Sequence, residues 1–86
     1  MADRIRLRVY TPERTLVDRD VREVTAQGAL GQIGVLPDHA ALVTALDPGV
    51  LSYRENGSVV HLSLGAGFAE VRDSVMTVLA ESGEPT

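Results

Sequence analysis

The sequence contains no cysteine and no lysine, and these two absences exclude several classes of protein. Without cysteine there is no disulfide, thiolate metal site or cysteine nucleophile, which leaves the redox compartment undetermined. Small β carrier domains of the biotinyl and lipoyl type need a lysine for their cofactor, so the chain is not one of these. A phosphate loop of the form GxxxxGK(S/T) needs a lysine too, and no GxGxxG precedes a helical pattern.

Aromatic residues are also scarce, at 3% of 86 residues, whereas 44% of the residues are hydrophobic. We therefore expect one small domain with an aliphatic core, and few aromatics make a poor lining for a ligand pocket. No apolar run approaches the roughly 20 residues that span a bilayer, and no signal peptide is evident. We expect a soluble, cytoplasmic protein. The net charge of −4 argues against a nucleic-acid partner.

The first half of the chain begins with a pattern typical of a strand. Residues 4–10 alternate arginine with aliphatic side chains, which predicts a half-buried antiparallel strand. A turn at 11–14 and a short return strand at 15–17 complete a hairpin. We interpret 18–20 as a polar break. The apolar pattern of the next strand, 21–26, slips by one residue, which marks a bulge or a strand that changes sheets.

The most irregular segment follows, with three glycines at a spacing of three (Gly28, Gly31 and Gly34) and then a turn that contains His39. Glycine takes positive φ without steric cost, so these positions indicate tight bends or close packing against another chain. Residues 40–46 have some helical spacing, but their threonine, valine and flanking prolines favour a buried strand.

Turn residues divide the second half of the chain into short strands. Asn56-Gly57 is typical of a type I′ hairpin, here between strands at 50–54 and 59–64. The alternation of the second strand places His61 on the outer face. Further strands are predicted at 68–72 and 75–80, before a polar tail. Eight to ten short antiparallel strands with frequent turns predict an all-β fold, a small β-sandwich or flattened barrel.

Catalytic patterns are scarce. No carboxylate lies at ligand spacing to either histidine, so we expect no metal site, and no serine sits on a nucleophile elbow. From chemistry alone, His39 is either a turn histidine whose ring bonds the backbone or a partner contact on an exposed turn. An enzyme with His39 as general base lacks an orienting carboxylate and a nucleophile. We expect no cofactor and no catalytic residue.

Four strings together resemble the epsilon subunit of F-type ATP synthases. GQIGVLPDHAALVTALDPGVL is similar to the central signature of that family, a glycine-x-x-glycine loop followed by a proline-x-His-Ala turn, a Leu-x-Thr-Ala segment and a Pro-Gly turn. VYTPERTLVD, LGAGFAEV and SVMTVLAE resemble its opening hairpin and its last two strands. The resemblance covers residues 4–81. It implies a ten-stranded β-sandwich at 1–81 and a noncatalytic rotor module of the central stalk, which supports the coupling of proton or sodium transport to ATP synthesis.

The resemblance also implies partners and contact residues. The module would join the gamma subunit to the c-ring at the cytoplasmic face of the bacterial inner membrane, and would touch the membrane only through the ring. Ring-facing positions of the family correspond to Gly31, Gln32, Ile33 and His39, and positions facing gamma to Thr11, Pro12, Leu42, Val43 and Thr44. Leu30 and Gln32 replace the acidic residues of many members, and Asp38 and Ala41 replace a glycine and a proline.

Typical members continue with two C-terminal helices that are missing here, so the sequence is either cut after its last strand or a naturally short form. Inhibition of hydrolysis and nucleotide sensing belong to those helices in the family. We therefore expect neither activity from residues 1–86, no nucleotide binding, and only a polar tail at 82–86. The alternative from another class is a stand-alone β-sandwich ligand-binding module whose glycine loop forms the pocket.

Overall fold

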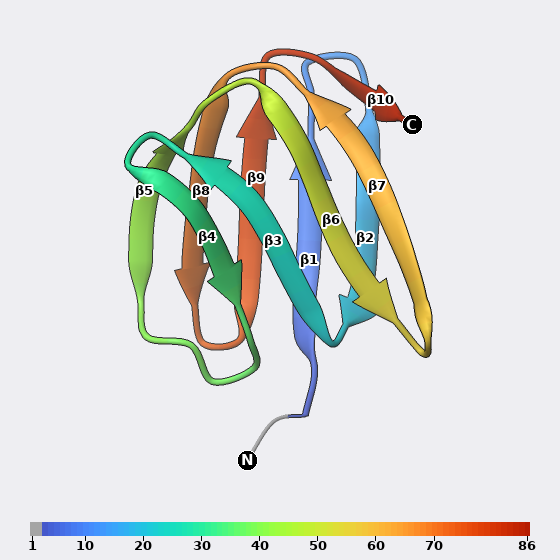
Figure 1. The fold of residues 1–86 in the computed structure, drawn as a ribbon, viewed down its shortest axis with the longest axis vertical. Coiled ribbons are helices and arrows are strands. Elements are labelled where there is room, and N and C mark those ends of the chain that lie inside the picture. The colour runs from blue at the N-terminus through green and yellow to red at the C-terminus, as the bar shows by residue number, and fades with distance from the viewer. Residues whose placement is uncertain (1–2) are drawn as a thin grey trace.

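The protein's computed structural model describes residues 3–86, which form strands but no helix (Figure 1). The all-β prediction is therefore confirmed, and those residues contain no helix able to cross a membrane. The ten strands are β1 (Ile5–Tyr10), β2 (Thr15–Val21), β3 (Glu23–Gly28), β4 (Gly31–Val35), β5 (Leu42–Leu46), β6 (Gly49–Glu55), β7 (Ser58–Leu64), β8 (Gly67–Arg72), β9 (Val75–Ala80) and β10 (Gly83–Pro85).

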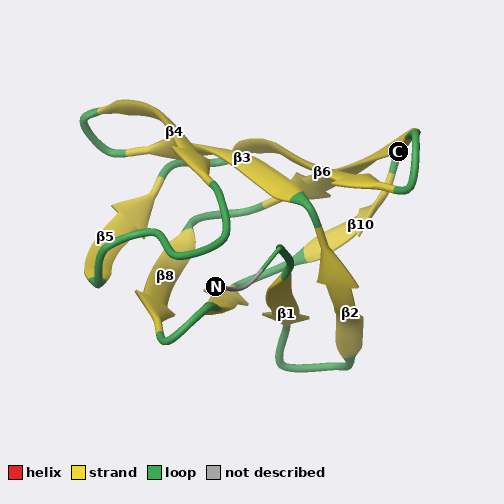
Figure 2. Cartoon of the chain, turned by 90° about the horizontal axis from the view of Figure 1, so that it is seen from below, coloured by secondary structure: helices red, strands yellow, loops and turns green. Residues whose placement is uncertain are grey.

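The strands form two layers that face each other (Figures 1 and 2). One layer has the order β4-β3-β6-β7-β10, and the other has the order β5-β8-β9-β1-β2. The layers are joined where Gly28 of β3 pairs with Leu46 of β5. Neighbours pair antiparallel except β1 and β9, which run parallel. The result is a ten-stranded β-sandwich closed along one side.

The core between the layers is almost entirely aliphatic, as the shortage of aromatic residues predicts, and Tyr53 is the aromatic side chain buried in it among the described residues. Alternate residues of the central strands point into it, and no described polar side chain is buried there. Its fully buried large side chains are Ile5, Leu7, Val9, Val21, Val24, Val35, Leu51, Val71, Met76 and Val78. This core fixes the faces of both sheets, so that alternate residues of each strand are left for the surface.

The polar break expected at 18–20 is wrong, because β2 runs without interruption to Val21. Its aspartates are held by arginines of the neighbouring strand. Arg6 Nε donates a hydrogen bond of 2.8 Å to Asp18 Oδ1, and Arg6 Nη1 lies 3.4 Å from Asp20 Oδ1. The slip in the apolar pattern marks a change of sheets, since β2 and β3 belong to different layers.

The turn predictions are confirmed at the β6–β7 and β8–β9 hairpins. Asn56 and Gly57 have φ of 47° and 90°, as a type I′ turn requires, and Asp73 and Ser74 have φ of 53° and 59°. These turns fix the registers of β6 with β7 and of β8 with β9. Registers in turn decide which side chains meet on the outer faces.

Two segments differ from their predictions. The polar tail contains strand β10, which pairs with β7 and places Gly83 so close to Leu64 and Leu16 that a Cβ atom would meet both side chains. The segment 40–46 does form a strand, as predicted, but β5 is half-exposed rather than buried, and Val43 on it is 72% exposed. The outward face of β5 therefore belongs to the surface.

Candidate docking surfaces

The glycine-rich segment forms the β3–β4 hairpin, which projects at one corner of the sandwich (Figure 1). Gly28 is buried beside Gly31, where a Cβ atom would lie 2.9 Å from the Gly31 carbonyl oxygen, and Gly31 itself has a φ of 128°. Both positions need glycine for these reasons. At the tip, Leu30 is fully exposed. Within residues 3–86, β4 pairs with β3 alone, so its other edge is open.

The four positions predicted to face the c-ring are spread along the open side of β4 and do not form one cluster. Gly31 and Gln32 are exposed at the start of β4, and Ile33 is half-buried against the core. His39 lies past the opposite end of β4, in the loop that leads to β5 (Figure 1). A partner that contacts all four must therefore extend along β4.

His39 is held by its own loop, as the turn-histidine interpretation predicts. Its backbone N–H donates a 3.1 Å hydrogen bond to the Leu36 carbonyl, and ring Nδ1 lies 2.6 Å from the Ala40 carbonyl oxygen. The preceding Asp38 has a φ of 64°, and its N–H donates to Ser74 Oγ at 3.4 Å. The loop is thus tied to the β8–β9 turn, with the His39 ring half-buried.

Three of the five positions predicted to face gamma lie on β5, where successive side chains point to opposite faces of the sheet. Val43 points outward, whereas Leu42 packs against the core and Thr44 is half-buried. Thr11 and Pro12 lie in the β1–β2 turn, where the Thr11 N–H donates to the Arg14 carbonyl at 2.9 Å. The structure therefore brings one of the three β5 positions to the outer face.

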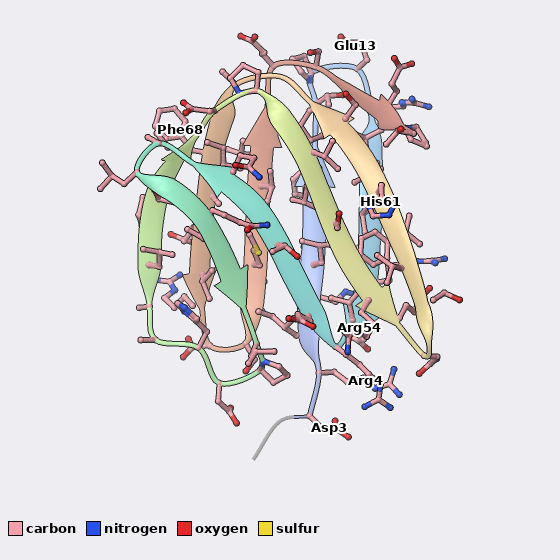
Figure 3. All side chains as sticks on the ribbon, in the orientation of Figure 1. Asp3, Arg4, Glu13, Arg54, His61 and Phe68 are labelled. Atoms are coloured by element: carbon pink, nitrogen blue, oxygen red, sulfur yellow. The ribbon has the colours of Figure 1, made fainter. Side chains whose placement is uncertain are left out.

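Two large apolar side chains beside Val43 were not predicted from the sequence to be surface contacts. Phe68 on β8 is 62% exposed and Leu79 on β9 is 56% exposed, although both strands bury their alternate residues. Phe68, which is labelled in Figure 3, pairs with Ala45 on one side and with Leu79 on the other. The only available signal was an apolar residue at an outward position. We call the exposed set Val43, Ala45, Phe68 and Leu79 the apolar patch.

Two hollows lie on either side of the Phe68–Leu79 pair. The larger has a volume of about 490 Å³ and is lined mostly by apolar residues at the end of β5, the start of β8 and the end of β9, together with Glu81. The smaller, of about 180 Å³, includes Val43, Glu70 and Thr77 in its lining. Both are open, and neither is lined by the glycine loop.

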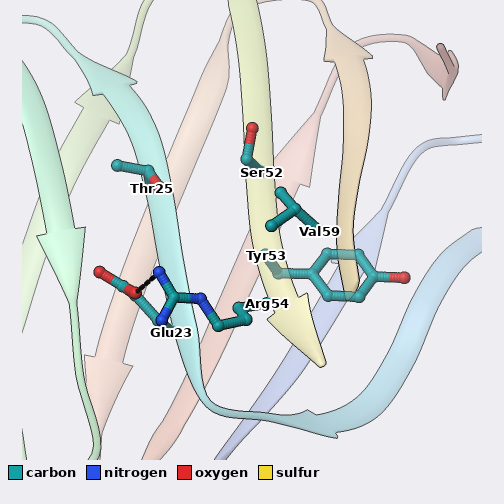
Figure 4. A pocket seen from close by; sticks show the side chains of 6 residues that line it. All are labelled: Glu23, Thr25, Ser52, Tyr53, Arg54 and Val59. Atoms are coloured by element: carbon teal, nitrogen blue, oxygen red, sulfur yellow. Dashed lines mark ion pairs between the residues drawn. The ribbon is translucent and has the colours of Figure 1, made fainter. Parts of the chain in front are cut away.

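The outer face of the other layer carries the polar groups most similar to a catalytic pair. Ser52 Oγ lies 2.7 Å from His61 Nδ1 across β6 and β7. Nearby, a shallow groove of about 100 Å³ includes the ion pair of Arg54 Nη2 with Glu23 Oε1, at 3.1 Å (Figure 4). This volume is below the range of about 300–1,000 Å³ typical of small-molecule sites. Residues 3–86 contain no cluster of three metal-ligating side chains.

Comparison with known proteins identifies the family. Residues 4–86 match the family described as "ATP synthase, Delta/Epsilon chain, beta-sandwich domain". The chain is 43% identical over 84 residues to the ATP synthase epsilon chain of Geobacter sulfurreducens and 45% identical over 84 residues to that of Carboxydothermus hydrogenoformans. These matches cover 98% of this chain but 61% and 63% of the two relatives. The chain therefore spans about three fifths of their length.

Solved structures agree on the fold. A chain of the Euglena gracilis mitochondrial ATP synthase, from a structure of its OSCP/F1/c-ring, superposes with a TM-score of 0.92 and 26% identity. The superposition covers 99% of this chain and 55% of the Euglena one. A chain from the central stalk/c-ring structure of the Tetrahymena thermophila enzyme superposes with a TM-score of 0.81 at 18% identity, over 93% of this chain and 65% of that one. The second likeness supports the fold alone.

Proposed function

The chain belongs to the family of ATP synthase delta/epsilon β-sandwich domains, and from this we propose that it is a noncatalytic module of the central stalk of an F-type ATP synthase. In this role it links the gamma subunit to the c-ring and supports the coupling of proton or sodium transport to ATP synthesis. The chain would then lie at the cytoplasmic face of a bacterial inner membrane, held there by its protein partners. No step of catalysis is assigned to it.

The apolar patch is the observation that carries the proposal. Phe68 is 62% exposed, so a partner that covers it removes apolar surface from water, and this favours binding. Val43, one of the residues expected to face gamma, lies in the same patch. Thr11 and Pro12 directly follow Tyr10, which neighbours Leu79 in the sheet. We therefore assign the outer face of β5, β8 and β9 to gamma.

The open side of β4 is the second proposed contact. The hairpin tip and β4 contain no charged residue, and Gln32 is exposed at the start of the strand. Glycines at Gly31 and Gly34 carry no side chain that would hold a partner's backbone away. We assign this side, from Leu30 to His39, to the polar loops of the c-ring. Close approach there relies on backbone groups, Gln32 and the exposed Leu30.

Single cysteines test both assignments, because the chain has none of its own. The chain would replace the epsilon chain in a Geobacter sulfurreducens F-type complex that carries cysteines on gamma and on the c-ring loops. Val43→Cys should form a disulfide with gamma and Gln32→Cys with the ring. His61→Cys, exposed on the outer face of β7, is the matched control and should form neither. Crosslinks from the control position alone would refute the assignment.

A further inference from the structure

Two carboxylates flank the apolar patch, and neither forms an ion pair within residues 3–86. Glu81 lines the larger hollow, and Glu70 lines the smaller one. Both side chains are exposed. The Phe68–Leu79 pair therefore lies between two acidic groups, each beside its own hollow.

The arginines on the same face do not neutralise this pair of carboxylates. Arg6 and Arg8 on β1 both contact Asp18, at 2.8 and 3.4 Å, and Arg6 also lies 3.4 Å from Asp20. Arg72 is two residues beyond Glu70 on β8, on the side away from Phe68, and makes no ion pair with a described residue. Glu70 and Glu81 are thus the charged residues among the described side chains that line the two hollows.

We propose that Glu70 and Glu81 select the partner of the apolar patch, which is a segment with apolar side chains flanked by lysine or arginine. This inference rests on the proposed function, in which gamma supplies the segment. Cationic side chains at both ends of the segment would meet one carboxylate each, while its apolar side chains cover Phe68 and Leu79. Charges at the rim of an interface act chiefly on association rate, salt dependence and partner choice.

The same carboxylates exclude a second copy of this chain from the patch. A twofold contact places the same surface of both copies together, so that Glu70 and Glu81 of one copy approach those of the other. Like charges at an interface suppress the wrong partner, and the net charge of −4 adds to the repulsion. An exposed apolar patch would otherwise favour self-association.

Binding to epsilon-depleted F1 of Geobacter sulfurreducens tests the inference. Glu70→Gln and Glu81→Gln should each weaken binding about two- to fivefold at low salt, the range for exposed ion pairs. The double variant should also lose most of the salt dependence, because salt screens charge pairs. Glu84→Gln, which removes an exposed carboxylate from β10 on the other layer, is the matched control and should bind like the unaltered chain.

A variant with Phe68→Ala and Leu79→Ala separates this inference from the proposed function. We expect it to weaken binding about tenfold or more, since central apolar contacts carry most of the affinity. If this variant loses binding while the Glu70→Gln, Glu81→Gln double variant keeps both affinity and salt dependence, the inference is overturned and the proposed function stands. If the unaltered chain does not bind F1, both are overturned.

Self-association gives a test that needs no partner. Sedimentation equilibrium should show more dimer for the Glu70→Gln, Glu81→Gln double variant than for the unaltered chain at the same concentration. Adding Phe68→Ala to the double variant should abolish the increase, because it removes the apolar contact. An unchanged monomer fraction in the double variant would overturn the role of the two carboxylates against a second copy.

Discussion

Phe68 and Leu79 lie directly opposite each other on β8 and β9, and both remain exposed on the outer face of the sheet. Adjacent side chains on one face of an antiparallel pair are in contact range, so the two form one apolar surface. Val71 and Met76, on the same two strands, point into the core instead. The two strands thus supply both the core of the domain and its proposed docking surface.

A matched pair of leucines separates these two roles. Leu62→Ala removes a side chain that is 2% exposed and should reduce the free energy of unfolding by about 2–5 kcal/mol, as other leucine truncations in cores do. Leu79→Ala alters an exposed side chain and should change the free energy of unfolding by about 0.5 kcal/mol or less. Urea unfolding measures both. Equal losses would show that Leu79 belongs to the core.

Glycine is required at position 67 by a close approach of two strands. A Cβ atom on Gly67 would lie 2.0 Å from the carbonyl oxygen of Leu79 and 2.8 Å from Cα of Ala80, so the strands must separate to accommodate it. Gly67→Ala should cost about 2 kcal/mol or more in thermal or urea unfolding.

Gly34→Ala is the matched control on β4, where a Cβ atom would meet no described atom within 4 Å. This substitution should change stability by about 1 kcal/mol or less, and in the stabilising direction if the reduced freedom of the unfolded chain dominates. Similar losses for the two variants would mean that the close approach at Gly67 is not what requires glycine.

The ion pairs between β1 and β2 predict a pH dependence. The hydrogen bond from Arg6 holds the pKa of Asp18 below its ordinary value, against the opposing effect of desolvation. A carboxyl with a lowered pKa stabilises the folded state above the unfolded pKa of about 3.9, and this is lost as pH falls through the folded value. Asp18→Asn should therefore remove part of the acid-induced loss of stability. Urea unfolding measures the free energy of unfolding of both proteins as a function of pH. An equal loss on acidification for the unaltered chain and the Asp18→Asn variant would contradict this role.

Much of the fold follows from local sequence. Local patterns of a few residues predict strand β1, through its alternation, and the Asn56-Gly57 turn. Neither prediction needs knowledge of tertiary contacts. The ends of β2 and β10 could not be predicted in this way, because they depend on partners distant in sequence. Asp18 is in a strand because arginines of β1 hold it, and β10 exists because the edge of β7 accepts it.

The docking surfaces could be predicted only in part from the sequence, because they too depend on contacts between distant segments. The resemblance led to Val43 and Gln32, which are exposed, but also to Leu42, which packs against the core. Phe68 and Leu79 belong to strands recognised from sequence, but their adjacency depends on the register of β8 with β9 and on which face the core covers. A pattern of alternation does not say which outward residues meet.

Solvent access at two exposed valines shows whether gamma covers the outer face of β5, β8 and β9. Val43→Cys lies in the apolar patch, whereas Val59→Cys lies on the outer side of β7 in the other layer, and each would be the single cysteine of the chain. Maleimide labelling is measured for the free chain and after its assembly with epsilon-depleted Geobacter sulfurreducens F1. We predict that assembly strongly slows labelling at Val43→Cys and leaves Val59→Cys unchanged. Protection of Val59→Cys with continued labelling of Val43→Cys would show instead that the partner covers the outer face of β7.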